Sequence, residues 1–249
     1  MKYLKIIIIC LLFINCSQDD RTENNINVSQ IPFPEASFKI TLKYDFEKFS
    51  TIHSSEYSFD ANGNVSAEKY ISTDNPKQSY FSTFQYDANG RIISETRNNY
   101  VVSHVIWSGN TAKVYHNTNL FPSTFVFSNG NLTEVIFQDS SASHKINYDS
   151  NSNIISEEQN NEVFVEYLNY NLSVSNPLHV LKSIAILRYD IRPFSKNIFE
   201  TKKAYPYEGD DFSIPLTFYQ FQYTLNQNSK VLTITDDETG IYKTFFEYY

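Results

Sequence analysis

The chain has 249 residues, of which 41% are apolar, and this is enough material to build a core and excludes a disordered tail. Its 20 Phe and 19 Tyr, against one Met and one Trp, favour strands over helices. The formal net charge of −8 has the wrong sign for a protein that binds the phosphates of nucleic acid, so we expect no nucleic-acid partner.

The first predicted element is an export signal. Lys2 and Lys5 come before an unbroken apolar run over residues 6–14. A charged segment followed by such a run is typical of a signal peptide. As a helix the run rises only about 14 Å, roughly half of a hydrocarbon core, which is too short to span a membrane. We therefore predict that residues 1–15 are a signal peptide.

Cys16 follows this run closely, and no cysteine comes after it. The sequence Ile14-Asn15-Cys16 resembles a bacterial lipobox, in which the cysteine is acylated and becomes the first mature residue. Asn15 departs from that pattern, which has a small residue at this place. The resemblance implies a lipoprotein that is anchored to a membrane by acyl chains such as palmitate on Cys16. The alternative is an ordinary signal peptide that is cleaved elsewhere.

Residues 16–35 are predicted to form a flexible tether, because their first part is polar and has low hydrophobicity. The start Cys-Ser-x-Asp-Asp also resembles many Bacteroidetes lipoproteins, in which an acidic cluster is associated with display on the cell surface. This implies a location at the outer membrane, facing the exterior; the alternative is a linker that faces the periplasm. Removal of Lys2 and Lys5 with the signal would change the net charge from −8 to −10, which disfavours contact with an anionic leaflet.

Residues 36–249 are predicted to be a single β domain, because a hairpin motif recurs at about 55–160. Aromatic residues at 59, 86, 107, 127 and 148 each lead a short polar turn. In these turns an Asp can accept backbone N–H groups, and a Gly can take the left-handed position of a three-residue hairpin loop. Ser152 stands where the fifth copy lacks the Gly, so we expect Asn153 to take the positive φ, or a different loop. The residues with predicted turn roles are Asp60, Asn62, Gly63, Asp87, Asn89, Gly90, Gly109, Asn129, Gly130 and Asp149.

Strand-forming stretches flank these turns, for example residues 79–86 and 91–96. A repeat of about 20 residues accommodates two strands of about seven residues and their connections, which is the arithmetic of an antiparallel meander. The sequence therefore predicts an all-β fold. We expect an antiparallel meander of about 10–14 strands that forms a curled sheet, with a barrel as its closed form.

The copy Tyr86-Asp87-Ala88-Asn89-Gly90-Arg91-Ile92 resembles the YD or RHS-type repeat, whose members wind antiparallel hairpins into curved sheets. The overall plan, with a lipoprotein start followed by such hairpins, is similar to an uncharacterised Bacteroidetes lipoprotein family that is described as having a porin-like β fold. Membership would imply a curled antiparallel sheet and no known activity.

The second half is less regular. Residues 171–216 contain four of the eight prolines and are predicted to be mostly connection. Residues 180–187 fit either one or two turns of helix or a buried strand. Strands are predicted again at 216–225, 230–236 and 242–249, and the last two are joined by a turn that contains Gly240.

No reaction is indicated by a motif. The histidines at 53, 104, 116, 144 and 179 lack metal-binding spacing, so we predict no metal and no cofactor. Ca²⁺ binding by the Asp-Ala-Asn-Gly turns is disfavoured, because hairpin geometry already explains these residues. Paired carboxylates from Asp60, Asp87 and Asp149 are also disfavoured, since their turn roles place them along one sheet edge. We therefore predict a protein that is not an enzyme.

Three functions stay open. The first is a lipid-anchored envelope module that binds a ligand or a partner, such as a glycan or an envelope protein, with Trp107 as the candidate contact residue. The alternative for Trp107 is a core aromatic in the same register as the other leading aromatics. The second function is a hydrolase of glycan or lipid in the 171–216 segment, around Tyr189, Asp190, Arg192 and Glu208. The third is a structural role beside outer-membrane machinery.

Overall fold

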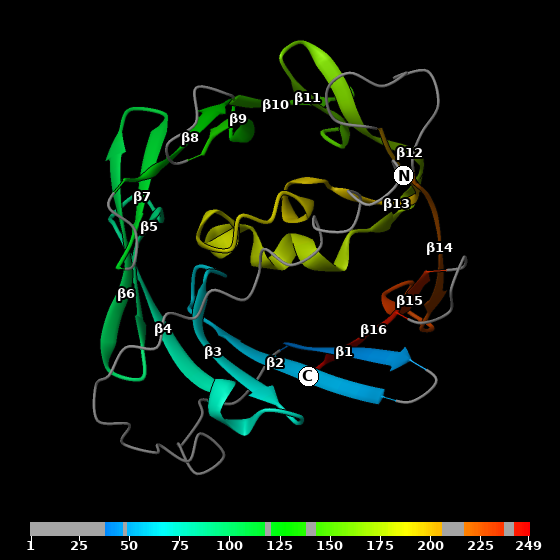
Figure 1. The fold of residues 1–249 in the computed structure, drawn as a ribbon, viewed down its shortest axis with the longest axis horizontal. Coiled ribbons are helices and arrows are strands. Elements are labelled where there is room, and N and C mark those ends of the chain that lie inside the picture. Colours follow the sequence, from blue (N-terminus) through cyan, green and yellow to red (C-terminus); the bar gives the residue numbers. More distant parts are fainter. Residues whose placement is uncertain (1–37, 47–48, 118–120, 138–142, 206–216, 237–241) are drawn as a thin grey trace, which may run out of the picture.

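In the computed structural model, the strands form one closed antiparallel barrel (Figure 1). The structure describes residues 38–46, 49–117, 121–137, 143–205, 217–236 and 242–249. The first and last strands pair with each other, and Ile40 lies opposite Phe246, so the ring is complete. The predicted all-β antiparallel meander is confirmed. The described strands number sixteen, which is more than the expected 10–14.

The strands follow one another around the ring in chain order. The stretches 79–86 and 91–96, which we predicted as hairpin arms, form β4 and β5, and the three predicted C-terminal strands form β14, β15 and β16. The strands are β1 (Phe38–Phe46), β2 (Phe49–Phe59), β3 (Val65–Ser72), β4 (Tyr80–Tyr86), β5 (Ile92–Arg97), β6 (Tyr100–Ser108), β7 (Thr111–His116), β8 (Ser123–Ser128), β9 (Asn131–Ile136), β10 (Ser143–Tyr148), β11 (Ile154–Gln159), β12 (Glu162–Ser175), β13 (Asn197–Ala204), β14 (Thr217–Leu225), β15 (Val231–Asp236) and β16 (Tyr242–Tyr248).

Four hairpin loops in the described residues share one geometry. In the first, the backbone N–H groups of Asn62 and Asn64 donate to Asp60 Oδ1 at 2.9 and 2.8 Å. Gly63 has a φ of +80°, which glycine adopts without strain. The Asp oxygen thus satisfies N–H groups that the reversal leaves unpaired. The same pair of bonds recurs in the loops that begin at Asp87, Asp149 and Asn226.

Two of the predicted turns are shorter than expected. The strand pairing leaves only two residues between β6 and β7 and between β8 and β9. Gly109, with φ +57°, lies in the first of these loops at the position where a type II′ turn requires glycine. Asn129 and Gly130 both have positive φ, as in a type I′ turn. The three-residue loop predicted for these two hairpins is therefore wrong.

The fifth copy of the motif keeps the loop geometry without glycine. Ser152 itself has a φ of +64°, so the expectation that Asn153 would take this conformation is wrong. Asn153 is fully buried instead, and its Oδ1 accepts the backbone N–H of Asn197 at 2.8 Å. Gly240 lies outside the described residues.

The leading aromatic of a hairpin has a polar as well as an apolar role. Tyr86 Oη donates to the carbonyl of Val65 at 2.7 Å, and Trp107 Nε1 donates to the carbonyl of Ile92 at 2.8 Å. In both cases the acceptor is the buried residue that starts the odd-numbered strand of the preceding hairpin. The aromatic position therefore ties neighbouring hairpins together. The same bond joins Tyr148 to Leu132, Tyr170 to Ile154 and Tyr248 to Val231.

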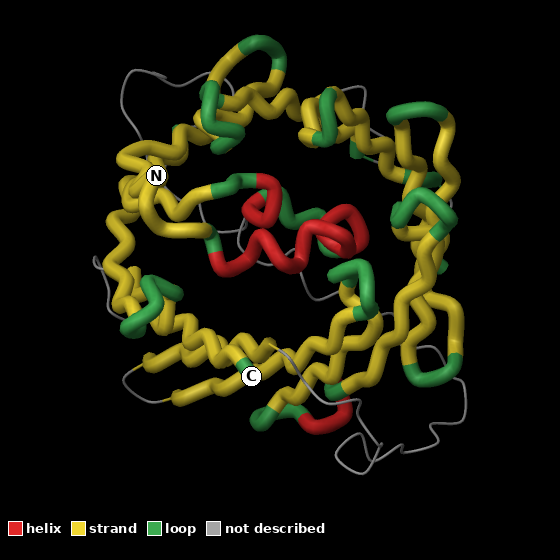
Figure 2. Tube along the Cα trace, turned by 180° about the vertical axis from the view of Figure 1, so that it is seen from behind, coloured by secondary structure: helices red, strands yellow, loops and turns green. Residues whose placement is uncertain are grey.

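The connection between β12 and β13 folds into the barrel. We call residues 176–196 the plug; it contains the 3₁₀ helices η3 (Pro177–Leu187) and η4 (Arg192–Phe194), and it lies inside the ring of strands (Figures 1 and 2). A further short 3₁₀ helix, η2 (Pro76–Gln78), lies in the loop between β3 and β4. The prediction that residues 171–216 are mostly connection holds for 176–196, whereas the end of β12 and all of β13 in the same segment are strand. Residues 180–187 are helical rather than a strand.

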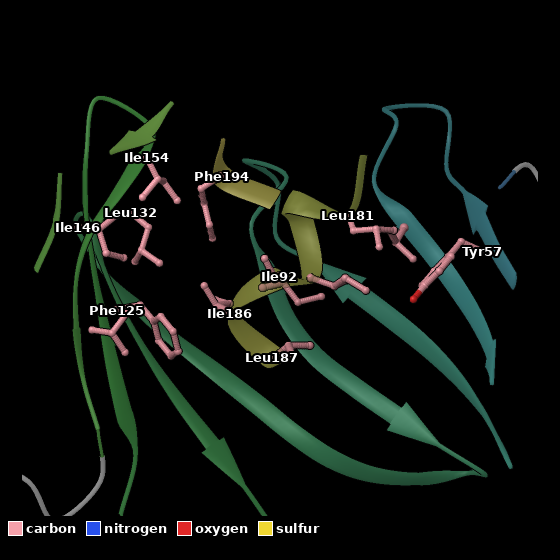
Figure 3. Close-up of a cluster of buried hydrophobic side chains, with 14 of the residues drawn as sticks. Tyr57, Ile92, Phe125, Leu132, Ile146, Ile154, Leu181, Ile186, Leu187 and Phe194 are labelled. Carbon is pink, nitrogen blue, oxygen red and sulfur yellow. The ribbon is translucent and has the colours of Figure 1, made fainter. Parts of the chain in front are cut away.

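The hydrophobic core lies between the plug and the inner face of the barrel. Ile186 and Phe194 of the plug face the wall residues Phe125, Leu132 and Ile146 (Figure 3). All five are at most 4% exposed. Burial of side chains of this size is worth roughly 1.5–3 kcal/mol each, so the plug is an integral part of the folded barrel.

The outer face of the barrel is polar. In β7, Ala112 and Val114 point inward and are fully buried, whereas Lys113 between them is exposed. Single apolar side chains such as Ile106 lie among these polar residues. A membrane-spanning barrel instead presents a continuous apolar band on this face. The outward charged side chains include Lys39, Lys69, Lys113, Lys145, Glu166, Lys203 and Glu247.

Candidate ligand-binding site

A cavity of about 320 Å³ lies between the plug and the strands β1–β3 and β12–β16. We call it the aromatic cavity. Much of its lining comes from rings and branched aliphatic side chains that the strand alternation turns inward. Its volume is in the range of ordinary small-molecule sites. The apolar lining includes Tyr57, Leu181, Ile198, Phe199, Phe221 and Phe246.

A second cavity of about 380 Å³ lies on the other side of the plug, against β8–β13. It is lined by Phe125, Leu132 and His144, among others. Burial lowers the pKa of His144, which favours its neutral form. The two cavities have four lining residues in common, so they meet at one polar boundary. These residues are Tyr167, Asp190, Arg192 and Lys202.

The carboxylates at this boundary already have partners. Arg192 Nε and Nη2 donate to the two oxygens of Asp190 at 2.9 and 2.8 Å, which is a bidentate pair. Tyr167 Oη donates to Glu157 Oε1 at 2.7 Å. Burial raises the pKa of the Glu157 carboxyl, and the hydrogen bond from Tyr167 and the charge of Lys202 oppose that rise. The boundary thus combines paired acids with a lysine.

A buried ionic cluster joins the plug to the wall on the β3–β5 side. Arg188 Nη1 donates to Glu95 Oε2 and Arg188 Nη2 donates to Glu68 Oε2, both at 2.7 Å. The side chains of Glu68 and Glu95 are 3% and 1% exposed, respectively. Burial would raise the pKa of Glu95, but the charge and hydrogen bonds of Arg188, with help from Arg97 and Ser82, lower it to about 2.

Two serines of the plug contact the barrel in the same way. The backbone N–H of Val65 donates to Ser183 Oγ at 3.2 Å, and the backbone N–H of Ile154 donates to Ser195 Oγ at 3.0 Å. In each case the hydroxyl of a tyrosine that also bonds a wall carbonyl, Tyr86 or Tyr170, lies 3.2 Å from the serine oxygen. The plug is therefore held at two hairpins by equivalent polar contacts.

Trp107, the predicted contact residue, borders a groove of about 430 Å³ where η3 meets the hairpin turns. Its indole N–H is bonded to the wall, its ring packs against Phe127 at 5.4 Å, and the Arg91 guanidinium lies 5.0 Å from its ring centroid. His179 and Lys182 line the same groove. These contacts place Trp107 in the register of the other leading aromatics, and its role as a contact stays a prediction.

Of the residues proposed for a hydrolase, Tyr189, Asp190 and Arg192 all line the second cavity. Their polar groups are bonded, since Arg192 binds Asp190 and Tyr189 donates to Ser123 Oγ at 3.1 Å. Glu208 lies outside the described residues, as does Cys16. Asp60, Asp87 and Asp149 each serve their own loop. In the described ranges no group of three or more His, Cys, Asp or Glu side chains is placed to hold a metal ion.

Of the residues at the cavity boundary, the sequence singled out Asp190 and Arg192 but not Tyr167 or Lys202. Lys202 and Glu157 lie in strands whose polar and apolar residues do not alternate cleanly, so their inward orientation is not readable from a period of two. Arg188 and the two plug serines carry no motif. All three lie in the 171–216 segment, but no sequence pattern singled them out there.

No helix in the part of the chain that the structure describes is long and apolar enough to cross a membrane.

Comparisons with known proteins bear on the fold alone. No protein-family model matches the chain, and no curated protein matches it. The structure is similar to the crystal structure of a porin-like protein from Bacteroides uniformis, with a TM-score of 0.55 and 12% identity over 88% of this chain and 99% of the other. A porin-like protein from Bacteroides vulgatus matches with a TM-score of 0.41 and 9% identity, over 84% and 97% of the two chains. The comparisons give no match to a YD or RHS repeat, and the porin-like β fold is confirmed: this chain folds as a barrel of the kind seen in the B. uniformis protein.

Proposed function

We propose that this chain is a cell-envelope protein that binds a small, largely apolar molecule inside a plugged barrel, and that it is not an enzyme. In this proposal acylated Cys16 anchors it to the outer membrane, where the tether presents the barrel to the exterior. The signal-like start of the sequence supports the anchor, and the fold shared with a porin-like protein supports an envelope location.

One observation carries the binding role: the barrel encloses a cavity lined mostly by apolar side chains, and its outer face carries charged side chains. Lys39 lies between the buried residues Phe38 and Ile40, and its Nζ lies 3.3 Å from Glu247 on the neighbouring strand. Lysines at such positions would be costly in a bilayer. Inward apolar side chains instead line much of the aromatic cavity, and the plug lies inside the ring of strands (Figure 1). This arrangement supports binding in the lumen rather than conduction through it.

The hydrolase reading has less support. Both oxygens of Asp190 are bound by Arg192, and Glu157 accepts a hydrogen bond from Tyr167. No nucleophile with an adjacent base is seen at this boundary among the described residues. Binding of a glycan or an envelope protein at the outer surface stays a prediction, as does a role beside outer-membrane machinery.

Ligand binding can be tested with the neutral apolar dye N-phenyl-1-naphthylamine on the mature chain carrying Cys16→Ser. We expect the protein to stay in solution without detergent and to increase the dye fluorescence in a saturable way. Leu178→Trp, which fills the aromatic cavity from η3, should weaken dye binding at least tenfold. Ile106→Trp, on the exposed outer face, should leave it unchanged. Absence of saturable binding, or ion conductance in planar bilayers, would contradict the proposal.

The anchor has its own test. Cys16→Ser in the full precursor should move the protein from the membrane fraction to the soluble fraction, because the acyl chains are lost. Protease treatment of intact cells should degrade the wild-type protein if the barrel faces the exterior. Sedimentation of the Cys16→Ser protein with membranes would refute lipid anchoring and leave the binding role untouched.

A further inference from the structure

Lys202 of β13 points into the barrel at the boundary of the two cavities. The strand register places it directly between Tyr167 of β12 and Tyr219 of β14. Because opposite residues in an antiparallel sheet share a face, the three side chains point the same way. Tyr167 is only 5% exposed and lines both cavities, so this shared face is the inner one.

The ammonium group of Lys202 lies near two aromatic rings and forms no ion pair with the residues that the structure describes. Its Nζ lies 6.0 Å from the ring centroids of both Tyr167 and Tyr219, at the outer limit of a cation–π contact. Within the described residues, no carboxylate oxygen lies within 4.0 Å of it. Burial lowers its pKa, which is the sign of a charge that the protein compensates only in part.

The neighbouring carboxylates of Asp190 and Glu157 do not pair directly with Lys202. Asp190 is bound bidentately by Arg192, and Glu157 influences Lys202 through space while it accepts a bond from Tyr167. A half-buried lysine without a direct anionic partner is costly in a folded protein, and an anion brought by a ligand would remove that cost.

The surroundings of Lys202 are otherwise aromatic. Phe199 packs edge-on against Tyr167 at 4.8 Å and against Phe221 at 5.4 Å. These rings line the aromatic cavity together with the lysine. A ligand that places an anionic group at Lys202 can therefore lay an apolar body along the rings without burying another charge.

We propose that the aromatic cavity takes an amphipathic acid, with its single anionic group on Lys202 and its hydrocarbon part against Phe199 and Phe221. This inference rests on the proposed lumenal binding function and names the ligand class. Lys202 acts in it as a binding residue that selects acids over neutral molecules of the same shape.

The test compares dodecanoic acid with its methyl ester as competitors of the dye in the mature chain carrying Cys16→Ser. We expect the acid to displace the dye at a concentration at least tenfold lower than the ester does. Lys202→Met should remove this preference by weakening the acid alone, and Lys202→Arg should restore it. The matched control is Lys203→Met, because Lys203 is the next residue, points outward and lies 3.8 Å from Glu166.

The outcomes separate the two proposals. Equal displacement by acid and ester, unchanged by Lys202→Met, would overturn the acid-binding inference while lumenal binding stands. Displacement by neither compound would likewise overturn the chosen ligand class. If the dye itself does not bind, the result contradicts the proposed lumenal binding function, and the acid-binding inference that rests on it falls as well. Cooperative thermal unfolding of each variant shows that a lost preference does not come from a misfolded barrel.

Discussion

The wall of the barrel and the plug inside it are held by different kinds of contact. In the wall, Asp87 binds backbone N–H groups only two and four residues further along the chain. In the plug, Arg188 binds Glu95 and Glu68, which are 93 and 120 positions away. Local contacts close short loops at low entropic cost, whereas the distant ones require the wall to be in place. The hairpins of the wall are therefore stabilised largely by local contacts, whereas the plug can take its position only when the wall has formed.

The largest expected effect is at the ionic cluster of the plug. Arg188→Met leaves buried Glu68 without its cation and leaves Glu95 with Arg97 alone, and removal of one partner of a buried pair costs about 3–5 kcal/mol. The free energy of unfolding in urea measures this loss. The control is Arg91→Met, which breaks a more exposed pair with Asp87 in the wall and should cost less than about 1 kcal/mol. Equal losses in the two variants would contradict the distinction between plug and wall.

Acid should weaken the same cluster. The pKa of Glu95 is about 2 in the folded protein against an ordinary value of 4.5, so the folded state binds this proton less readily than the unfolded state. Its contribution, on the order of 3 kcal/mol, is present above about pH 4.5 and is lost as the pH falls toward 2. Urea midpoints across this range should fall less steeply in Glu95→Gln than in the wild type. Parallel pH profiles would show that Glu95 is not the responsible group.

The plug serines should have smaller effects. Ser183→Ala and Ser195→Ala each leave a backbone N–H of the wall without its acceptor, which costs about 1–3 kcal/mol. We expect faster cleavage of the plug by protease under native conditions in both variants. Ser94→Ala, whose hydroxyl bonds Gln85 on the outside, is the matched control. Unchanged cleavage in both plug variants would mean that these contacts do not hold the plug.

The smallest effects on stability are expected in the turns, where they test the local contacts of the wall. Gly90 has a φ of +74° and Ser152 a φ of +64° at the same place in their loops. Gly90→Ala should therefore destabilise the protein by about 1–2 kcal/mol, and Ser152→Gly should stabilise it by a similar amount. Thermal unfolding measures both. A change of the same sign in the two variants would refute the shared loop geometry.

Much of the wall could be predicted from sequence because its information is local. The Asp and Gly of the turns and the aromatic before them recur, and β4, β5 and the last three strands lie where the strand-forming stretches predict them. Turns without this signal were missed. Asn98-Asn99 and Asn160-Asn161 both form two-residue loops with positive φ, although neither contains glycine. Asparagine tolerates this conformation, but its presence alone does not mark a hairpin.

The plug and the cavity boundary could not be predicted for a physical reason. Residues 180–187 read equally well as helix or buried strand, and the enclosing ring, which is built from both halves of the chain, decides between them. The positions of Lys202 and Glu157 at the cavities can be recognised only in the folded barrel, in which β11 and β13 curve around the plug. The prolines of the 171–216 segment did mark the irregular region, since Pro177 and Pro193 each lie at the start of a 3₁₀ helix.

The pairing of β1 with β16 has a consequence for how the molecule can be rearranged. Phe38 lies opposite Tyr248, with their ring centroids 5.3 Å apart, so the two ends of the folded domain are adjacent. A short linker could join these ends, and new termini could be placed in the two-residue turn 109–110 without removing any strand from the ring. Such a circular permutant would keep the same pairing between neighbouring strands, but the strands after the turn would be synthesised before those that precede it.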